Sequence, residues 1–238
     1  MLARPPAQFN LARYCLADNA RRRPDKLALT VAGAGERAER LTFRDIDMTV
    51  RAMAAGLQDM GRSPGDRVVI RMANDADYVL VYLAAIAAGL VAVPSSTQLT
   101  AAEAGFLLAD TGAAAVAVSA EFMAATAAPA HVRVLGPDDI AALKRHPPLG
   151  DYAGTAADDP AYLIYTSGTS ARPKGVLHAH RAMWGRRPMY EHWLGLGESD
   201  VMLHAGALNW TYTLGVGLLD PWACGAACVL YNGPKDNT

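Results

Sequence analysis

The most informative segment of this chain is Tyr165-Thr166-Ser167-Gly168-Thr169-Ser170-Ala171-Arg172-Pro173-Lys174-Gly175-Val176. It follows a short apolar run and contains four serine or threonine hydroxyls, two glycines and a lysine. Glycine lets backbone amides approach a ligand's oxygen atoms, hydroxyls donate hydrogen bonds, and lysine adds a mobile positive charge. This combination suits an anionic polyphosphate, because a charge-assisted hydrogen bond contributes roughly 1.5–3 kcal/mol.

This segment has two other possible interpretations, a P-loop and a solvated hairpin loop. A P-loop requires Gly-Lys-Ser/Thr at the start of a helix, but here Pro173 precedes Lys174 and Gly175 follows it. The spacing therefore excludes a P-loop. A solvated hairpin loop rich in turn-forming residues is the structural alternative.

Outward from this segment, short apolar runs alternate with helical patterns along almost the whole chain. Buried strands separated by helices predict an α/β fold with layered, largely parallel sheets flanked by helices. The first two strands predict a hairpin around Gly33 and Gly35. The expected strands are 27–31, 40–43, 68–70, 90–93, 114–118, 132–135, 162–165, 175–178, 201–204 and 227–231, and the expected helices are 10–22, 44–60, 75–88, 101–109, 121–127 and 181–193.

Residues 146–160 interrupt this alternation. They contain three prolines, two glycines and three aspartates, a composition typical of a loop. We interpret this loop as a candidate boundary between two sheet-bearing halves.

Composition excludes several protein classes. The chain has 238 residues, and its formal net charge of −1 gives no electrostatic footprint for nucleic acid. The most apolar stretch, 78–93, is shorter than the roughly 20 residues of a membrane-spanning helix. The sequence therefore predicts no membrane span. It also predicts a cytoplasmic protein, because three cysteines are too few for a secreted disulfide framework.

Metal binding by side chains is not expected. Cys224 and Cys228 have no third ligand at metal-binding spacing, and neither do His178 and His180. We interpret all four as structural residues.

Several segments of the chain resemble those of one protein family. Residues 166–175, Thr-Ser-Gly-Thr-Ser-Ala-Arg-Pro-Lys-Gly, resemble the signature loop of the adenylate-forming superfamily, which includes acyl-coenzyme A synthetases, luciferases and peptide-synthetase adenylation domains. Residues 10–14, 23–28, 41–45, 65–68 and 89–94 are similar to other recurring segments of that family. Residues 176–180, Val-Leu-His-Ala-His, are closer to the acyl-coenzyme A branch.

The resemblance implies a two-step reaction. A carboxylate attacks the α-phosphate of Mg2+-bound ATP to give an acyl-adenylate, and coenzyme A then displaces AMP. The signature loop would hold the β- and γ-phosphates by electrostatic positioning. Carried over by position, the phosphate-contacting residues are Thr166, Ser167, Gly168, Thr169, Ser170, Lys174 and Gly175.

Residues 204–215 form the second candidate region. By the resemblance they line the acyl pocket or approach the nucleotide, with Trp210 and Tyr212 as walls and Asn209 as a polar contact. Packing of these aromatic side chains in the core is the alternative. The substrate would be a small carboxylic acid that the sequence does not name.

One residue departs from the family pattern. Ala171 stands where the family often has glycine, and a left-handed backbone there would cost alanine roughly 1–2 kcal/mol. We therefore expect a negative φ at Ala171 or a mobile loop.

Several family features have no counterpart in these 238 residues. They are the acidic residue for magnesium, the ribose-binding aspartate, the hinge and the late catalytic lysine. We therefore expect residues 1–238 to be the N-terminal part of the large domain, without the C-terminal lid domain and without a catalytic residue. Unpaired strand edges and exposed apolar surface predict self-association or low stability of the isolated fragment.

Three alternatives remain open at this stage. The chain could be an aryl-acid or peptide-synthetase adenylation domain, a non-catalytic module that binds ATP or phosphate, or a fragment kept for assembly.

Overall fold

The computed structural model describes residues 3–33, 38–166 and 173–233. Its strands form two sheets, and the smaller sheet has the order β2-β1-β10-β9. Strand β1 pairs antiparallel with β2 and parallel with β10, which also pairs parallel with β9. The predicted hairpin of the first two strands is therefore confirmed. The bounds are β1 Leu27–Ala32, β2 Glu39–Thr42, β9 Val201–His204 and β10 Ala227–Tyr231.

The larger sheet has six strands in the order β6-β5-β3-β4-β7-β8. All neighbours are parallel except β7 and β8, which form an antiparallel hairpin. The predicted α/β class with largely parallel sheets is thus confirmed. The bounds are β3 Arg67–Arg71, β4 Val91–Pro94, β5 Ala115–Val118, β6 Arg133–Leu135, β7 Pro160–Thr166 and β8 Lys174–Ala179.

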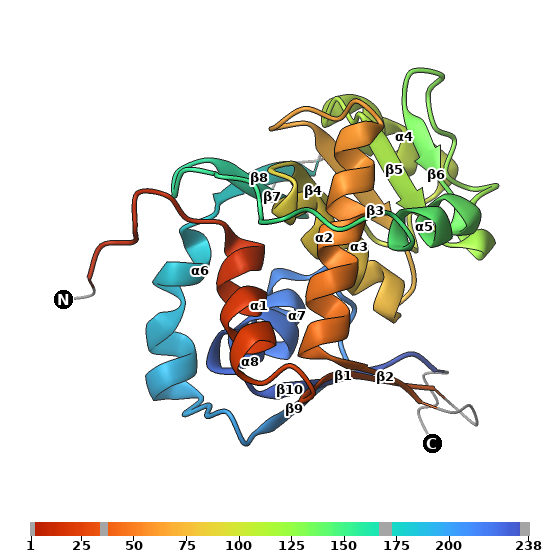
Figure 1. Cartoon of the computed structure of the whole chain (residues 1–238). Helices are drawn as coiled ribbons and strands as arrows, with labels where there is room; N and C mark the ends of the chain where they lie inside the picture. The colour runs from red at the N-terminus through yellow and green to blue at the C-terminus, as the bar shows by residue number, and fades with distance from the viewer. Residues whose placement is uncertain (1–2, 34–37, 167–172, 234–238) are drawn as a thin grey trace.

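Helices pack between and around the two sheets (Figure 1). Helices α1 (Leu11–Arg22), α2 (Phe43–Asp59) and α3 (Ala76–Ala87) share one apolar core with strands of both sheets. Helix α3 is buried on every side, with eleven of its twelve residues buried. Helix α4 (Ala101–Asp110) covers the opposite face of the larger sheet and forms a second cluster with β3, β4 and β5.

The helix starts follow the sequence signals. Thr42 caps α2 and Thr100 caps α4, each through a capping box in which the hydroxyl accepts from the third helical amide. Asp75 caps α3 by accepting from the Tyr78 amide at 2.8 Å. Such caps satisfy amides that the helix itself leaves without acceptors.

Two predicted helices are wrong in extent. Over 121–127 the chain forms only a 3-10 turn, Ala120–Phe122, and Ala127 has a φ of 44°, outside the right-handed helical region. Over 181–193 the helix is split into α6 (Ala182–Gly185) and a π-helical turn (Met189–Trp193). Pro188 lies at the break and lacks the amide that a continuous helix needs.

Four helical segments were missed. They are α5 (Pro137–Lys144), α7 (Thr211–Leu214), a π-helical turn (Gly215–Leu219) and α8 (Asp220–Cys224). The last three follow one another and pack behind the smaller sheet, where Trp222 is fully buried.

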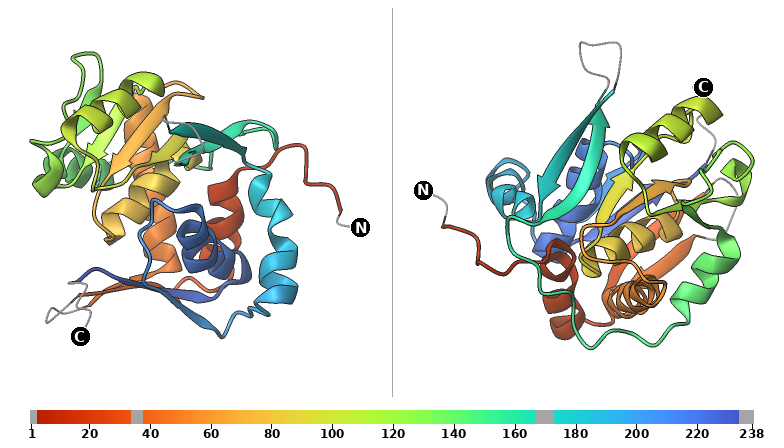
Figure 2. Two further views of the ribbon diagram at one scale, coloured as in Figure 1. Left: turned by 180° about the vertical axis from the view of Figure 1, so that it is seen from behind. Right: turned by 90° about the horizontal axis from the view of Figure 1, so that it is seen from above.

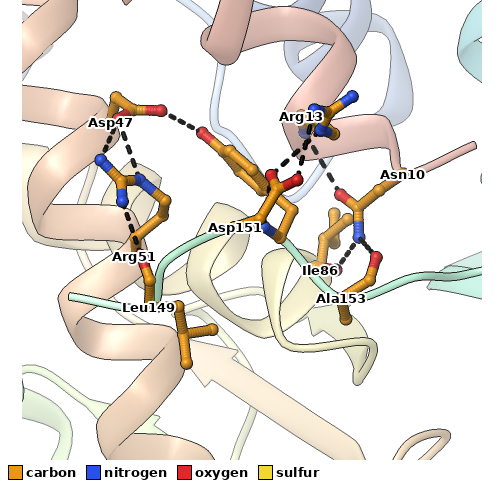
Figure 3. A network of polar contacts seen from close by, with 9 residues as sticks. Asn10, Arg13, Asp47, Arg51, Ile86, Leu149, Asp151 and Ala153 are labelled. Carbon is orange, nitrogen blue, oxygen red and sulfur yellow. Dashed lines mark hydrogen bonds and ion pairs between the residues drawn. The ribbon is translucent and has the colours of Figure 1, made fainter.

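The loop that begins at residue 146 is held by polar contacts (Figure 3). Asp47 accepts from Arg51 Nη2 at 2.8 Å and from the Tyr152 hydroxyl at 2.5 Å. Asn10 Nδ2 donates to the carbonyl oxygens of Ile86 (3.0 Å) and Ala153 (3.3 Å). The strands before and after this loop, β6 and β7, belong to the same sheet. The domain limits remain a prediction.

Candidate functional site

The β7–β8 hairpin places the two ends of the signature segment side by side. Thr166 and Lys174 are direct partners in the antiparallel register, and Tyr165 faces Gly175. Thr166 and Lys174 are both exposed. Ser167, Gly168, Thr169, Ser170 and Ala171 lie outside the described residues, and so does the expectation about the Ala171 backbone. Figure 2 shows the hairpin extending from the body of the molecule.

Two contacts fix the base of this hairpin. The Tyr165 hydroxyl donates to Asp110 Oδ2 at 2.5 Å, which ties β7 to the end of α4. Burial and the Asp110 carboxylate raise the pKa of Tyr165, so its hydroxyl stays protonated and donates. A Cβ on Gly175 would lie 3.1 Å from Leu163 Cδ1 and 3.4 Å from the Tyr165 ring. Close packing against Leu163 and Tyr165 is therefore a second reason for a glycine at position 175.

A cavity of about 660 Å³ opens beside Thr166. We call it the Trp210 cavity, and its lining includes Pro94, Phe106, Thr166, Asn209 and Trp210. It brings together three of the residues selected from the sequence. Tyr212 is not among its lining residues; the ring packs against His204, with the ring centroids 5.5 Å apart.

The segment that carries Asn209 and Trp210 is held by one side chain. Asn74 Nδ2 donates to the Gly206 carbonyl at 2.9 Å, and Asn74 Oδ1 accepts from the Leu208 amide at 3.0 Å. These two bonds fix the backbone just before Asn209. Trp210 itself is 58% exposed, so its ring forms an outer wall instead of packing in the core.

A second cavity of about 360 Å³ lies on the other side of Thr166, which lines both. We call it the Arg186 cavity. Tyr82 from α3, Tyr162 from β7, His178 from β8 and Arg186 contribute its polar side chains, with Leu214 and Leu219 among the apolar ones. His178 stacks on Tyr162, with ring centroids 4.5 Å apart and an interplanar angle of 6°. Burial lowers the pKa of His178, so its ring is mainly neutral near pH 7.

Arg186 forms a bidentate ion pair with Asp220. Its Nε lies 2.7 Å from Asp220 Oδ1, and its Nη2 lies 2.5 Å from Oδ2. Asp220 is fully buried. Burial by itself lowers the pKa of Arg186, but the hydrogen bond and the charge of Asp220 outweigh it and raise that pKa overall. Arg186 is therefore charged at every pH at which the protein is folded.

A glycine makes room for this guanidinium. A Cβ on Gly215 would lie 2.3 Å from Arg186 Nη2 and 2.5 Å from its Cζ. No real Cβ makes such contacts, so any side chain at position 215 would displace Arg186.

Sequence reasoning missed Arg186, Asp220 and Tyr82. A weak signal for the ion pair was present, because Asp220 is the only charged residue in the apolar run 214–224 and a charge in such a run needs a partner. Its partner, 34 residues away, has no local signature.

Of the two histidines expected to be structural, His178 lines the Arg186 cavity and His180 lies in the core. His180 is fully buried, and its Nδ1 accepts from the Leu11 amide at 3.0 Å. Across the described ranges, no group of three or more His, Cys, Asp or Glu side chains is arranged to hold a metal. Within the same ranges, no helix is long and apolar enough to cross a bilayer.

Comparison with known proteins gives consistent matches. The family model for AMP-binding enzymes matches residues 16–238. Benzoate–CoA ligase from Thauera aromatica is 31% identical over 202 residues, which cover 79% of this chain and 38% of the relative. The crystal structure of the anthranilate CoA ligase AuaEII with anthranoyl-AMP superposes with a TM-score of 0.88 at 26% identity, covering 97% of this chain and 45% of that one.

A third match concerns the fold alone. The N-terminal domain of FACL13 from Mycobacterium tuberculosis has a TM-score of 0.84 at 24% identity, over 95% of this chain and 58% of that one. The chain thus spans less than half the length of the benzoate and anthranilate ligases it resembles. Its fold is that of the N-terminal domain of adenylate-forming enzymes, and the chain belongs to the AMP-binding enzyme family.

Proposed function

We propose that this chain supplies the phosphate-binding loop and part of the acid-binding site of an ATP-dependent, AMP-forming acyl-coenzyme A synthetase. One observation carries the proposal. The hairpin register sets Thr166 opposite Lys174, and Thr166 also lines both neighbouring cavities. A polyphosphate bound between these two side chains lies next to space for a second substrate.

The phosphate role is assigned to Thr166, Lys174 and Gly175, together with Ser167, Gly168, Thr169 and Ser170. Thr166 and Lys174 are both exposed and are direct partners in the hairpin register. Both can therefore reach the outer phosphates of one ATP molecule. Their contribution is electrostatic stabilisation of the leaving pyrophosphate, without covalent chemistry.

The substrate is a compact carboxylic acid, and an aromatic acid is favoured. The Thauera aromatica relative is a benzoate–CoA ligase, and the AuaEII structure holds anthranoyl-AMP. Asn209 and Trp210 would contact the acid or the nucleotide from the Trp210 cavity, with Tyr212 nearby in the chain. Coenzyme A would be the acceptor in the second step, and Mg2+ would enter with ATP; we assign the metal to no residue of this chain.

The assignment of Lys174 can be tested by ATP binding, measured by isothermal titration calorimetry on the 238-residue chain. Loss of a charge-assisted hydrogen bond of roughly 1.5–3 kcal/mol should weaken binding by about tenfold to a hundredfold in Lys174→Ala. Lys144→Ala is the matched control, because this lysine pairs with Asp77 at the side of α3, away from the hairpin. Equal ATP affinity in wild type and Lys174→Ala would refute the phosphate role.

A second candidate is ATP or phosphate binding without catalysis. It requires only the facing pair Thr166 and Lys174 on the hairpin, without a bound acid. Pyrophosphate exchange into ATP with a panel of carboxylic acids separates the two. Exchange that depends on the acid supports the enzyme, and ATP binding without exchange supports the module. A peptide-synthetase or other aryl-acid adenylation domain would show exchange but no transfer to coenzyme A.

A further inference from the structure

The Arg186 cavity combines apolar walls with two polar groups whose hydrogen bonding is incomplete. The bidentate bond to Asp220 uses Arg186 Nε and Nη2, which leaves Nη1 for another acceptor. The Tyr82 hydroxyl is fully buried and has no hydrogen-bond partner among the described residues. Leaving a buried hydroxyl without a partner costs about 1–3 kcal/mol.

The Tyr82 hydroxyl is neutral, so it can donate a hydrogen bond to a ligand oxygen or accept one from a ligand. Burial raises its pKa well above the ordinary value, so the hydroxyl keeps its proton. Its neighbour Tyr162 is similarly protonated, because burial raises the pKa of Tyr162 to about 12. The cavity thus offers neutral phenols beside a guanidinium.

The charge of the guanidinium is already balanced. Asp220 is fully buried and lies within 2.7 Å of Arg186 at both of its oxygens. A second carboxylate brought to Arg186 would approach Asp220 as well, and two like charges in a desolvated site repel. The cavity is therefore suited to a neutral acceptor, such as a hydroxyl, and unsuited to a second anion.

We propose that the Arg186 cavity binds the non-reacting end of the acid substrate and selects acids that carry a neutral hydrogen-bonding substituent, such as a hydroxyl group, through Tyr82 and Arg186. The proposal rests on the proposed function for the identity of the reacting carboxylate. A volume of about 360 Å³ lies at the small end of ligand sites, which run from about 300 to 1,000 Å³. It suits a single ring better than a long alkyl chain.

The test measures binding of three acids to the 238-residue chain by calorimetry without nucleotide. The probes are 4-hydroxybenzoate, 4-methylbenzoate, which has a similar size but no hydrogen-bonding group, and terephthalate, which carries a second carboxylate. We expect 4-hydroxybenzoate to bind about threefold to tenfold more tightly than 4-methylbenzoate, as one hydrogen bond allows, and terephthalate to bind weakest.

Two matched variants locate the effect. Tyr82→Phe removes only the hydroxyl of a residue that lines the cavity and should bring the affinity ratio of 4-hydroxybenzoate to 4-methylbenzoate close to one. Tyr78→Phe removes another buried hydroxyl from the same helix, one that also has no partner within the described part of the chain, but Tyr78 does not line the cavity. That control should keep the wild-type ratio, and both variants should keep the wild-type circular dichroism spectrum.

Three outcomes would overturn the proposal. They are equal affinity of the wild type for 4-hydroxybenzoate and 4-methylbenzoate, an unchanged ratio in Tyr82→Phe, and no binding of any of the three acids to the folded chain. The proposed function fails separately, on the Lys174→Ala measurement of ATP affinity. The acid ratio needs no nucleotide, so the two failures can be told apart.

Discussion

Helix α3 and the edge strands β8 and β9 are all rich in apolar residues, but their exposure is opposite. Eleven of the twelve α3 residues are buried. On β8, Val176 and Leu177 are 43% and 56% exposed, and on β9, Val201 and Leu203 are 65% and 63% exposed. Helix α3 lies between two sheets, whereas β8 and β9 each end a sheet. Apolar content therefore does not determine burial here; position in the layer order does.

The contrast also separates stability from function. Of the candidate phosphate residues, Thr166 ends β7, and Lys174 and Gly175 begin β8, where they are exposed. The core that supports these strands lies around α3. Substitutions in the two regions should therefore have different consequences.

The largest effect is expected for the buried ion pair. Asp220→Ala leaves Arg186 without its partner in a desolvated site, and such a loss costs about 3–5 kcal/mol of unfolding free energy. Asp151→Ala breaks the pair with Arg13, in which both side chains are more than half exposed, and should cost less than about 1 kcal/mol. Urea unfolding followed by circular dichroism measures both. Equal losses of unfolding free energy in the two variants would mean that burial does not determine how much each ion pair stabilises the fold.

A similar contrast is expected for leucines. Leu83→Ala in α3 empties a fully buried site and should destabilise by about 2–5 kcal/mol. Leu177→Ala on β8 should change the unfolding free energy by less than about 0.5 kcal/mol. Comparable losses in the same urea titration would show that β8 is covered in solution.

The pH dependence of stability should reveal His180. Burial lowers its pKa from 6.5 to about 4 in the folded protein, so the unfolded chain binds the proton first as the pH falls. This contribution, at most about 3 kcal/mol, is present above pH 6.5 and is lost between pH 6.5 and 4. Asp75 acts in the opposite direction, because burial raises its pKa to about 6 and favours the folded state at low pH.

The comparison is therefore made between wild type and His180→Asn, which keeps an acceptor for the Leu11 amide but does not titrate. Unfolding free energies are measured at pH 7, 5.5 and 4.5. Wild type should lose more stability than His180→Asn as the pH falls, and parallel curves for the two proteins would contradict the assignment.

The smallest change in folding stability is expected on the β9 edge. Leu203→Lys should alter the unfolding free energy by less than about 0.5 kcal/mol. A lysine on an edge strand discourages pairing with another chain, so the variant should lower the average mass measured by light scattering at high protein concentration. An equal mass for both proteins would show that this edge does not mediate association.

Much of the fold was predictable from local pattern. The apolar runs of β3, β4 and β5 and the caps at Thr42 and Thr100 identify their elements directly. Helix α5 was missed although Pro137 and two aspartates begin it, a usual start signal. The helical segments after Thr211 were missed because Gly215, Gly217 and Pro221 weaken a helical pattern that only burial against the sheet supports.

The candidate site was predictable only where the chemistry is contiguous. The signature segment contains its own evidence, so Thr166 and Lys174 were identified without a structure. The Arg186 cavity depends on residues from α3, β7, β8 and the segments around Arg186 and Leu214. No periodicity or spacing connects them, because tertiary packing alone brings them together.

The pairing of β1 with β10 has a consequence for biosynthesis. Residues 29–32 pair with residues 228–231, so an inner strand of the smaller sheet comes from a segment that the ribosome makes about 200 residues after β1. The larger sheet can assemble from residues 67–179 while translation continues, at about 5–20 residues per second. The β1–β2 hairpin therefore lacks its β10 neighbour for roughly ten seconds or longer. A chaperone that shields this hairpin on the nascent chain would increase the yield of folded protein.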